Sequence, residues 1–114
     1  MTTKWNALLR LAVTATAMAA LLFVSSQVQA QSGGEKVYKA KCAACHGPDG
    51  TGNTPTGKAM KVPSLCSEEA KKATDAQWTE TITKGKNKMP GYDKKLTEAE
   101  IKDVIAYARG LCKK

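Results

Sequence analysis

The chain has 114 residues, a formal net charge of +8 at pH 7 and an aromatic content of only 5%. The 84 residues that follow the first thirty are enough for one domain but too few to bury a large hydrophobic core without help. The positive charge comes mainly from lysines that lack the base-reading and stacking groups of nucleic-acid interfaces, so we expect no nucleic-acid partner.

The first thirty residues have the form of a secretory signal peptide. An uncharged apolar run covers residues 11–24, and Val28 and Ala30 are small enough to favour cleavage after Ala30. The run is short for a membrane span, which needs about 20 residues, so an uncleaved anchor is the less favoured alternative. We expect residues 1–30 to be removed, leaving residues 31–114 as one soluble periplasmic domain with no stable membrane insertion.

Cys42 and Cys45 are separated by two residues, and His46 follows Cys45 directly. This is the attachment signature of c-type haem, in which the thiols bond to the vinyl groups and the histidine can ligate the iron. A redox dithiol, a disulfide, or a zinc site completed by Cys66 or Cys112 are the alternatives. Export favours haem, because covalent attachment belongs to oxidising compartments. The motif predicts one haem c, covalently bound through Cys42 and Cys45.

Two further cysteines, Cys66 and Cys112, lie outside the motif. An even number of cysteines in a small exported chain most simply means that the remaining two pair with each other. Such a disulfide closes a loop of 47 residues and contributes about 4 kcal/mol on the chain-entropy model. The alternative is that one or both thiols stay free.

The exported part of the chain shows helical periodicity and no alternating strand pattern, so we expect an all-α domain. Apolar residues recur every three or four positions over residues 34–44, which predicts a helix that runs into the motif. Residues 47–61 are rich in Gly, Thr, Pro and Lys, which indicates an irregular loop. Ser67 is placed to cap a short helix that extends to about residue 73.

Two capping boxes predict the last two helices. Thr74 with Gln77 opens a helix that Gly85 ends, and Thr97 precedes the final helix, which is expected to stop at Gly110. In the final helix, apolar residues at i, i+3, i+4 and i+7 define one buried face. That face consists of Ile101, Val104, Ile105 and Ala108.

From residue 34 to about residue 111 the sequence resembles the small monohaem class I cytochromes c. The residues that carry the resemblance, besides the haem motif, are Gly34, Tyr38, Met89-Pro90, Val104 and Tyr107. The resemblance implies the class I cytochrome c fold, with three to four short helices wrapped around one covalently attached haem. It also implies that the first and last helices cross closely, with the glycine permitting the approach and aromatic side chains filling the contact.

The iron needs a second axial ligand, and His46 is the only histidine of the chain. Outside the signal peptide there are two methionines, Met60 and Met89. Met60 lies in the predicted loop and is expected to pack at the haem edge or in the core. Met89 follows His46 by 43 residues and precedes Pro90, as the resemblance requires of the ligand. We therefore expect His46 and Met89 to bind the iron, a ligand pair that raises the reduction potential.

The resemblance implies further contacts to the cofactor. The His46 ring hydrogen is expected to bond to a backbone carbonyl in a proline segment, with Pro55 as the first candidate and Pro63 as the alternative. Trp78 is expected to pack on the haem and to donate its indole N–H to a propionate, or else to be a half-buried core residue. Tyr92, beside the ligand segment, is a candidate for the same contact as Trp78.

With both axial positions filled, no open site remains for a substrate, and no catalytic residues are predicted. The resemblance therefore implies a non-enzymatic electron carrier that moves single electrons between redox proteins. One alternative is an electron-transfer subunit of a larger redox enzyme. Another is a haem enzyme or gas sensor in which Met89 is displaced from the iron.

Lysines are concentrated around Met89, where five of them stand against a single acidic residue, Asp93. A basic surface accelerates association with acidic partners, whereas the alternative is simply a solvated loop. We expect an electron donor and an acceptor with acidic docking surfaces, and a monomeric carrier. The five residues are Lys84, Lys86, Lys88, Lys94 and Lys95.

Overall fold

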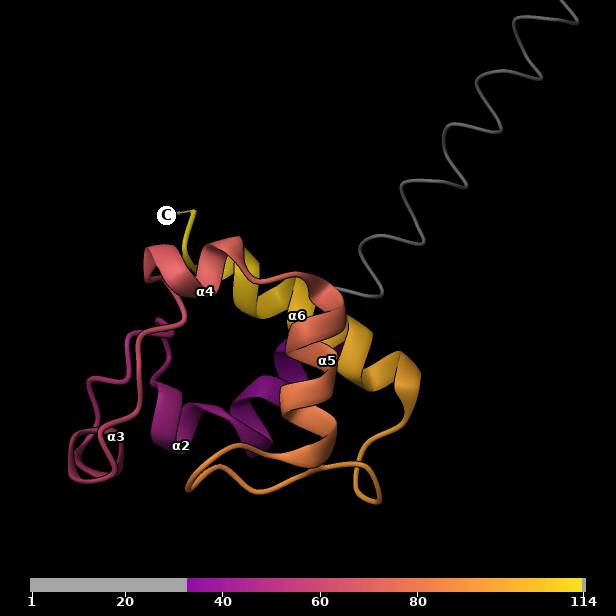
Figure 1. Ribbon diagram of the computed structural model, residues 1–114, viewed down its shortest axis with the longest axis horizontal. Helices are drawn as coiled ribbons and strands as arrows, with labels where there is room; N and C mark the ends of the chain where they lie inside the picture. The colour runs from indigo at the N-terminus through magenta and orange to yellow at the C-terminus, as the bar shows by residue number, and fades with distance from the viewer. Residues whose placement is uncertain (1–32, 114) are drawn as a thin grey trace, which may run out of the picture. The chain divides into compact units, whose positions relative to one another are not determined.

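The computed structural model describes residues 33–113; the predicted signal peptide lies outside them. Residues 33–41 are helical. They are followed by α2 (Ala43–His46), α3 (Pro55–Ala59), α4 (Glu68–Lys72), α5 (Asp75–Lys84) and α6 (Glu98–Leu111) (Figure 1). The only strand-like pairing over this range is an isolated bridge between Lys86 and Met89. The prediction of an all-α domain is confirmed.

The core lies where helical residues 33–41 cross α6 (indigo and yellow in Figure 1). A Cβ atom on Gly34 would collide with the backbone carbonyl oxygen of Asp103, so this position admits only glycine at the observed spacing. The rings of Tyr38 and Tyr107 meet at the crossing with their centroids 5.4 Å apart. The close crossing implied by the sequence is confirmed. The buried side chains are Tyr38, Ile101, Val104, Ile105 and Ala108, which include the whole predicted face of α6.

The sequence predicts one continuous helix over residues 34–44 that runs into the motif, but the first helix of the structure stops before it. It is interrupted at Cys42, and α2 follows as a separate turn. The backbone N–H groups of Cys45 and His46 both donate to the Cys42 carbonyl, at 3.2 and 3.0 Å. The resulting turn is tighter than an α-helical turn and contains both cysteines and the histidine.

The segment 47–61 was expected to be irregular, but it contains the single-turn helix α3. Thr54 caps this helix by accepting a hydrogen bond from the Gly57 N–H at 2.9 Å, and Pro55 occupies the first turn, where its missing N–H costs nothing. Because α2 and α3 are single turns, the described chain has more helices than the three to four predicted.

The remaining helices begin where the sequence predicts. Ser67 caps α4, and the capping boxes of α5 and α6 are both formed, at Thr74 and Thr97. The end of α6 differs by one residue: Gly110 lies inside the helix, which continues to Leu111. A helical glycine followed by an apolar residue is tolerated here because helix packing outweighs its low intrinsic propensity.

The predicted disulfide between Cys66 and Cys112 is confirmed, with the two Cα atoms 5.2 Å apart. It joins the segment before α4 to the residue that ends α6. The turn of the chain at Gly50 packs beside it, because the Leu65 N–H donates to the Gly50 carbonyl at 2.8 Å. The disulfide therefore anchors the long segment after the motif to the helix that forms the core.

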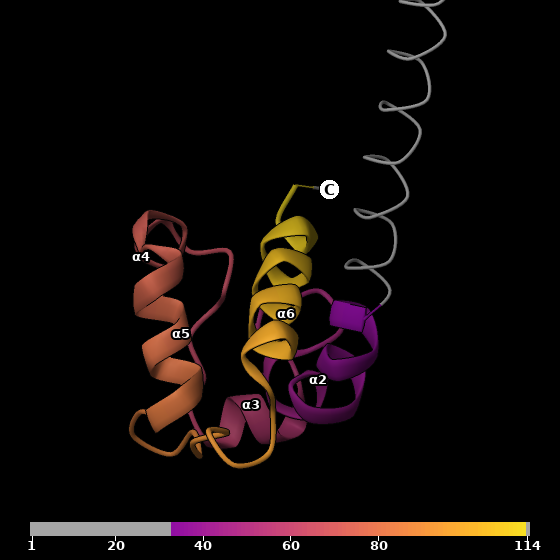
Figure 2. The ribbon, with the colours of Figure 1, turned by 90° about the vertical axis from the view of Figure 1, so that its right-hand side faces the viewer.

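Helices α2 and α3 pack together, and α5 packs on α6. The loop that follows α5 returns toward α3 in both views (Figures 1 and 2). Segments that are far apart in the sequence are thereby brought around one space. None of the helices within residues 33–113 combines the length and the hydropathy needed to cross a bilayer.

We expect Gly34→Ala to lower the free energy of unfolding by about 1–3 kcal/mol, because the added methyl group forces the two crossing backbones apart. Gly110→Ala is the matched control, since nothing lies within 4 Å of a Cβ atom at that helical position. This control should leave the stability unchanged or raise it by about 0.5–1 kcal/mol. Denaturant unfolding of the two variants measures the difference, and equal effects would contradict the close crossing.

Candidate haem site

A single cavity brings the motif and the predicted second ligand together. Cys42, Cys45 and His46 line it from the turn around α2, and Met89 lines it from the loop after α5. These two segments are 43 residues apart in the sequence, so only the fold can place them around one space. The other lining residues are Lys41, Met60, Val62, Lys88, Pro90 and Tyr92.

Cys42 and Cys45 are free, half-buried thiols. Burial, with a smaller contribution from Cys45, raises the pKa of Cys42 to about 11. A redox-active Cys-x-x-Cys pair has a lowered thiol pKa, so the environment of Cys42 does not suit that alternative. Two unpaired thiols that line a cavity beside an imidazole do suit the covalent attachment of a haem.

The zinc alternative fails on its fourth ligand. Cys66 and Cys112 are bonded to each other, so neither thiol is available to complete a site with the motif. Over residues 33–113 there is also no cluster of three or more His, Cys, Asp or Glu side chains arranged to hold a metal ion.

His46 is half-buried and has one ring nitrogen without a hydrogen-bond partner. Burial lowers its pKa, so the imidazole keeps a free lone pair at neutral pH. Its Nδ1 is, among the described side chains, the one buried nitrogen or oxygen atom without a hydrogen-bond partner. A buried polar atom normally has a hydrogen-bond partner. In a histidine that binds a metal through one ring nitrogen, the hydrogen on the other ring nitrogen normally donates such a bond.

Neither proline carbonyl proposed for the His46 ring hydrogen bonds to it in this structure. Pro55 lies exposed in the first turn of α3, and neither Pro55 nor Pro63 lines the cavity. The acceptor for the His46 ring hydrogen therefore stays a prediction.

Several hydrogen bonds hold the motif in place, and sequence reasoning missed most of them. The Tyr38 hydroxyl donates to the Gly47 carbonyl at 2.6 Å, and the Gly52 N–H donates to the His46 carbonyl at 2.7 Å. The Thr54 hydroxyl donates to the Ala44 carbonyl at 2.9 Å, which ties α3 to α2. Thr54 followed by a proline is a helix-start signal that could have revealed the start of α3, although not the contact with Ala44.

Met89 is held by a tight turn at the end of α5. Its N–H and carbonyl both pair with Lys86, at 2.9 and 3.1 Å. Gly85 has a φ of +80°, and a Cβ atom there would lie only 2.5 Å from the Met89 carbonyl oxygen. The chain then returns to α5, where the Tyr92 N–H donates to the Ile82 carbonyl at 2.8 Å. The backbone around the predicted ligand is therefore fixed to α5.

Met60 also lines the cavity, but its environment differs from that of Met89. It ends α3 and is 42% exposed, the one large hydrophobic residue of the described chain in this state. Because α3 packs on α2, Met60 stands on the same side of the molecule as the motif. This placement agrees with a packing position at the edge of the cavity.

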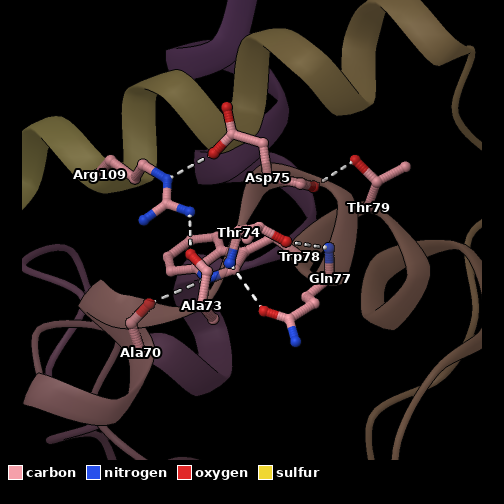
Figure 3. Close-up of polar contacts among 8 residues, drawn as sticks. All are labelled: Ala70, Ala73, Thr74, Asp75, Gln77, Trp78, Thr79 and Arg109. Carbon is pink, nitrogen blue, oxygen red and sulfur yellow. Dashed lines mark hydrogen bonds and ion pairs between the residues drawn. The ribbon is translucent and has the colours of Figure 1, made fainter.

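Trp78 is not brought into the cavity with the other predicted site residues. Its indole N–H donates to the Ala70 carbonyl at 3.1 Å, and the guanidinium carbon of Arg109 lies 4.5 Å from its ring centroid. Arg109 in turn donates to the Ala73 carbonyl at 2.6 Å and to the Asp75 carboxylate at 2.8 Å (Figure 3). In this structure Trp78 therefore joins α4 and α5 to α6.

The fold and this cavity define the chain as a class I cytochrome c. The model of the family described as cytochrome c oxidase, cbb3-type, subunit III matches residues 29–107. The chain belongs to this family.

Its relatives include proteins of two kinds. The chain is 38% identical over 88 residues to the cbb3-type cytochrome c oxidase subunit CcoP of Cereibacter sphaeroides, covering 68% of this chain and 26% of CcoP. It is 34% identical over 100 residues to cytochrome c6 of Thermostichus vulcanus, covering 83% of this chain and 86% of that protein. This chain therefore spans about a quarter of the CcoP relative and most of the cytochrome c6.

A solved structure described as the KustC0563 c-type cytochrome has the same fold, with a TM-score of 0.63 and 31% sequence identity. The superposition covers 68% of this chain and 95% of that protein. As a member of the cytochrome c family, this chain carries haem c bound covalently through cysteine residues.

We expect Trp78→Phe to lower the free energy of unfolding by about 1–2 kcal/mol, because the Ala70 carbonyl loses its donor and the stacking under Arg109 weakens. The visible absorption spectrum and the reduction potential should remain those of the wild type. Denaturant unfolding and potentiometry of the same samples test this. A shifted potential at unchanged stability would instead support the propionate contact.

Proposed function

We propose that the chain is a one-electron carrier with a single haem c attached through Cys42 and Cys45 and ligated by His46 and Met89. The observation that carries this proposal is that one cavity is lined by both thiols, by the only imidazole of the chain and by the Met89 segment. The half-buried His46 supports it further, because its Nδ1 is buried without a hydrogen-bond partner and its ring lines the cavity.

When bound, the haem supplies an iron that alternates between the ferrous and ferric states. The chain keeps the imidazole neutral by burial, and Met89 offers a soft, uncharged thioether, which favours the reduced iron. Pro55, with Pro63 as the alternative, remains the proposed acceptor for the His46 ring hydrogen. With His46 and Met89 both holding the iron, no coordination position would be left for a substrate or a gas, so we propose a carrier and not an enzyme or gas sensor.

Met89→Ala tests the ligand assignment, with Met60→Ala as the matched control, because both methionines line the cavity. The Met89 variant should lose the far-red methionine–iron absorption of the oxidised protein, have a lower reduction potential and bind carbon monoxide when reduced. The Met60 variant should keep this absorption and should not bind carbon monoxide when reduced. Reversed results would assign the ligand to Met60, and rapid carbon monoxide binding by the wild type would favour a sensor or enzyme.

We also propose that the carrier is a free, monomeric periplasmic protein of residues 31–114, released by cleavage after Ala30. The signal-like sequence of residues 1–30 supports export, and the near-complete coverage of a cytochrome c6 supports an independent domain. An electron-transfer subunit of a larger redox enzyme is the second candidate. It is favoured by the match to CcoP, of which this chain spans 26%.

The electron donor and acceptor are proposed to dock through acidic surfaces. Lys86, Lys88, Lys94 and Lys95 are exposed, and Lys88 also lines the cavity. Lys84 is exposed too, but its ammonium group is 2.9 Å from the Glu80 carboxylate, which reduces its contribution. Of the remaining lysines, Lys88 lies where an electron would enter or leave the cavity, and the others are near it in the sequence.

We expect the rate constant for oxidation by ferricyanide, a small anionic probe, to fall as salt shortens the Debye length from about 30 Å at 0.01 M to about 8 Å at 0.15 M. The Lys86→Gln/Lys88→Gln variant should start lower and fall less. Lys36→Gln/Lys102→Gln removes two exposed lysines that do not line the cavity and should behave nearly as the wild type. Equal losses in the two variants would assign the effect to net charge alone.

A further inference from the structure

The cavity has two sides of different origin. One is the motif wall, residues 41–46, and the other is the ligand loop, residues 85–93. In the part of the chain that the structure describes, one polar contact joins them: the Tyr92 hydroxyl donates to the Lys41 carbonyl oxygen at 3.3 Å. Both residues line the cavity, so this contact spans the space between the two sides.

The Lys41 carbonyl can accept this bond because of the interruption at Cys42. In a continuous helix this carbonyl would accept from the backbone N–H four residues later, which is that of Cys45. Here the Cys45 N–H donates to the Cys42 carbonyl instead. The interruption at Cys42 therefore leaves the Lys41 carbonyl without its usual helical donor and free to accept from Tyr92.

Among residues 33–113, the ligand loop has no other polar attachment across the cavity. Its backbone bonds run within the loop, back to α5 through Ile82 at 2.8 Å and Thr83 at 3.3 Å, or to the turn that follows, where the Lys95 N–H donates to the Tyr92 carbonyl at 3.0 Å. Gly91 packs against the same end of α5, where a Cβ atom would lie 2.6 Å from the Thr83 carbonyl oxygen. These contacts fix the shape of the loop but not its distance from the motif wall.

We propose that Tyr92 is a positioning residue whose hydroxyl, bonded to the Lys41 carbonyl, holds the ligand loop against the motif wall and keeps Met89 opposite His46. This role rests on the proposed ligation by Met89. The ring is itself steadied by the Lys95 ammonium group, 5.7 Å from its centroid. Loss of the hydroxyl should leave the ring packed but allow the loop to move away from the iron more often.

Tyr92→Phe in the haem-loaded protein tests this, with imidazole as a probe that binds oxidised iron only after Met89 has left it. The expected result is a rate of imidazole binding about two- to tenfold higher than in the wild type, the range that one lost hydrogen bond allows. Tyr107→Phe is the control, because its ring packs on Tyr38 and its hydroxyl makes no hydrogen bond among the described residues. That variant should bind imidazole at the wild-type rate.

Amide hydrogen exchange gives a second readout. The Met89 N–H, bonded to the Lys86 carbonyl at 2.9 Å, should exchange faster in Tyr92→Phe than in Tyr107→Phe. An unchanged imidazole rate and unchanged exchange in Tyr92→Phe would overturn the role of Tyr92 while the methionine–iron absorption persists. Absence of that absorption from the wild type would overturn the ligation by Met89, and the positioning role with it.

Discussion

Helical residues 33–41 and α6 approach each other too closely for a Cβ atom at Gly34, and the position of the site follows from that contact. Gly34 has no side chain to separate it from the Asp103 carbonyl, so Tyr38, one turn later, is buried against α6. From there the Tyr38 hydroxyl reaches the Gly47 carbonyl directly after the motif. The close packing at Gly34 thus positions Tyr38, and the bond from Tyr38 to Gly47 in turn positions the residue next to His46.

The second side of the cavity depends on the same helix, α6, by a longer route. The ligand loop is fixed to α5, and α5 is fixed to α6 partly through Arg109, which contacts Trp78, Ala73 and Asp75. The position of the ligand loop relative to the motif wall therefore depends on a shared helix as well as on the direct contact between Tyr92 and Lys41.

Features encoded over a few residues could be predicted from the sequence, and features that depend on long-range packing could not. The capping boxes at Thr74 and Thr97 and the buried face of α6 are local patterns, and all are present. The single turn α3 was missed because Gly, Thr and Pro also favour irregular loops. The partner of the Trp78 indole depends on where α4 ends, which no motif at Trp78 reveals.

The disulfide between Cys66 and Cys112 makes the intervening chain a covalent ring that contains α4, α5, the ligand loop and α6. Met89 lies on this ring, whereas His46 lies on the open chain before it. A single cut of the backbone anywhere within the ring, including the exposed lysine-rich turn beside Met89, releases no fragment. The two cut ends stay joined through the sulfur atoms, so the segment that carries Met89 remains part of the same molecule as the haem motif.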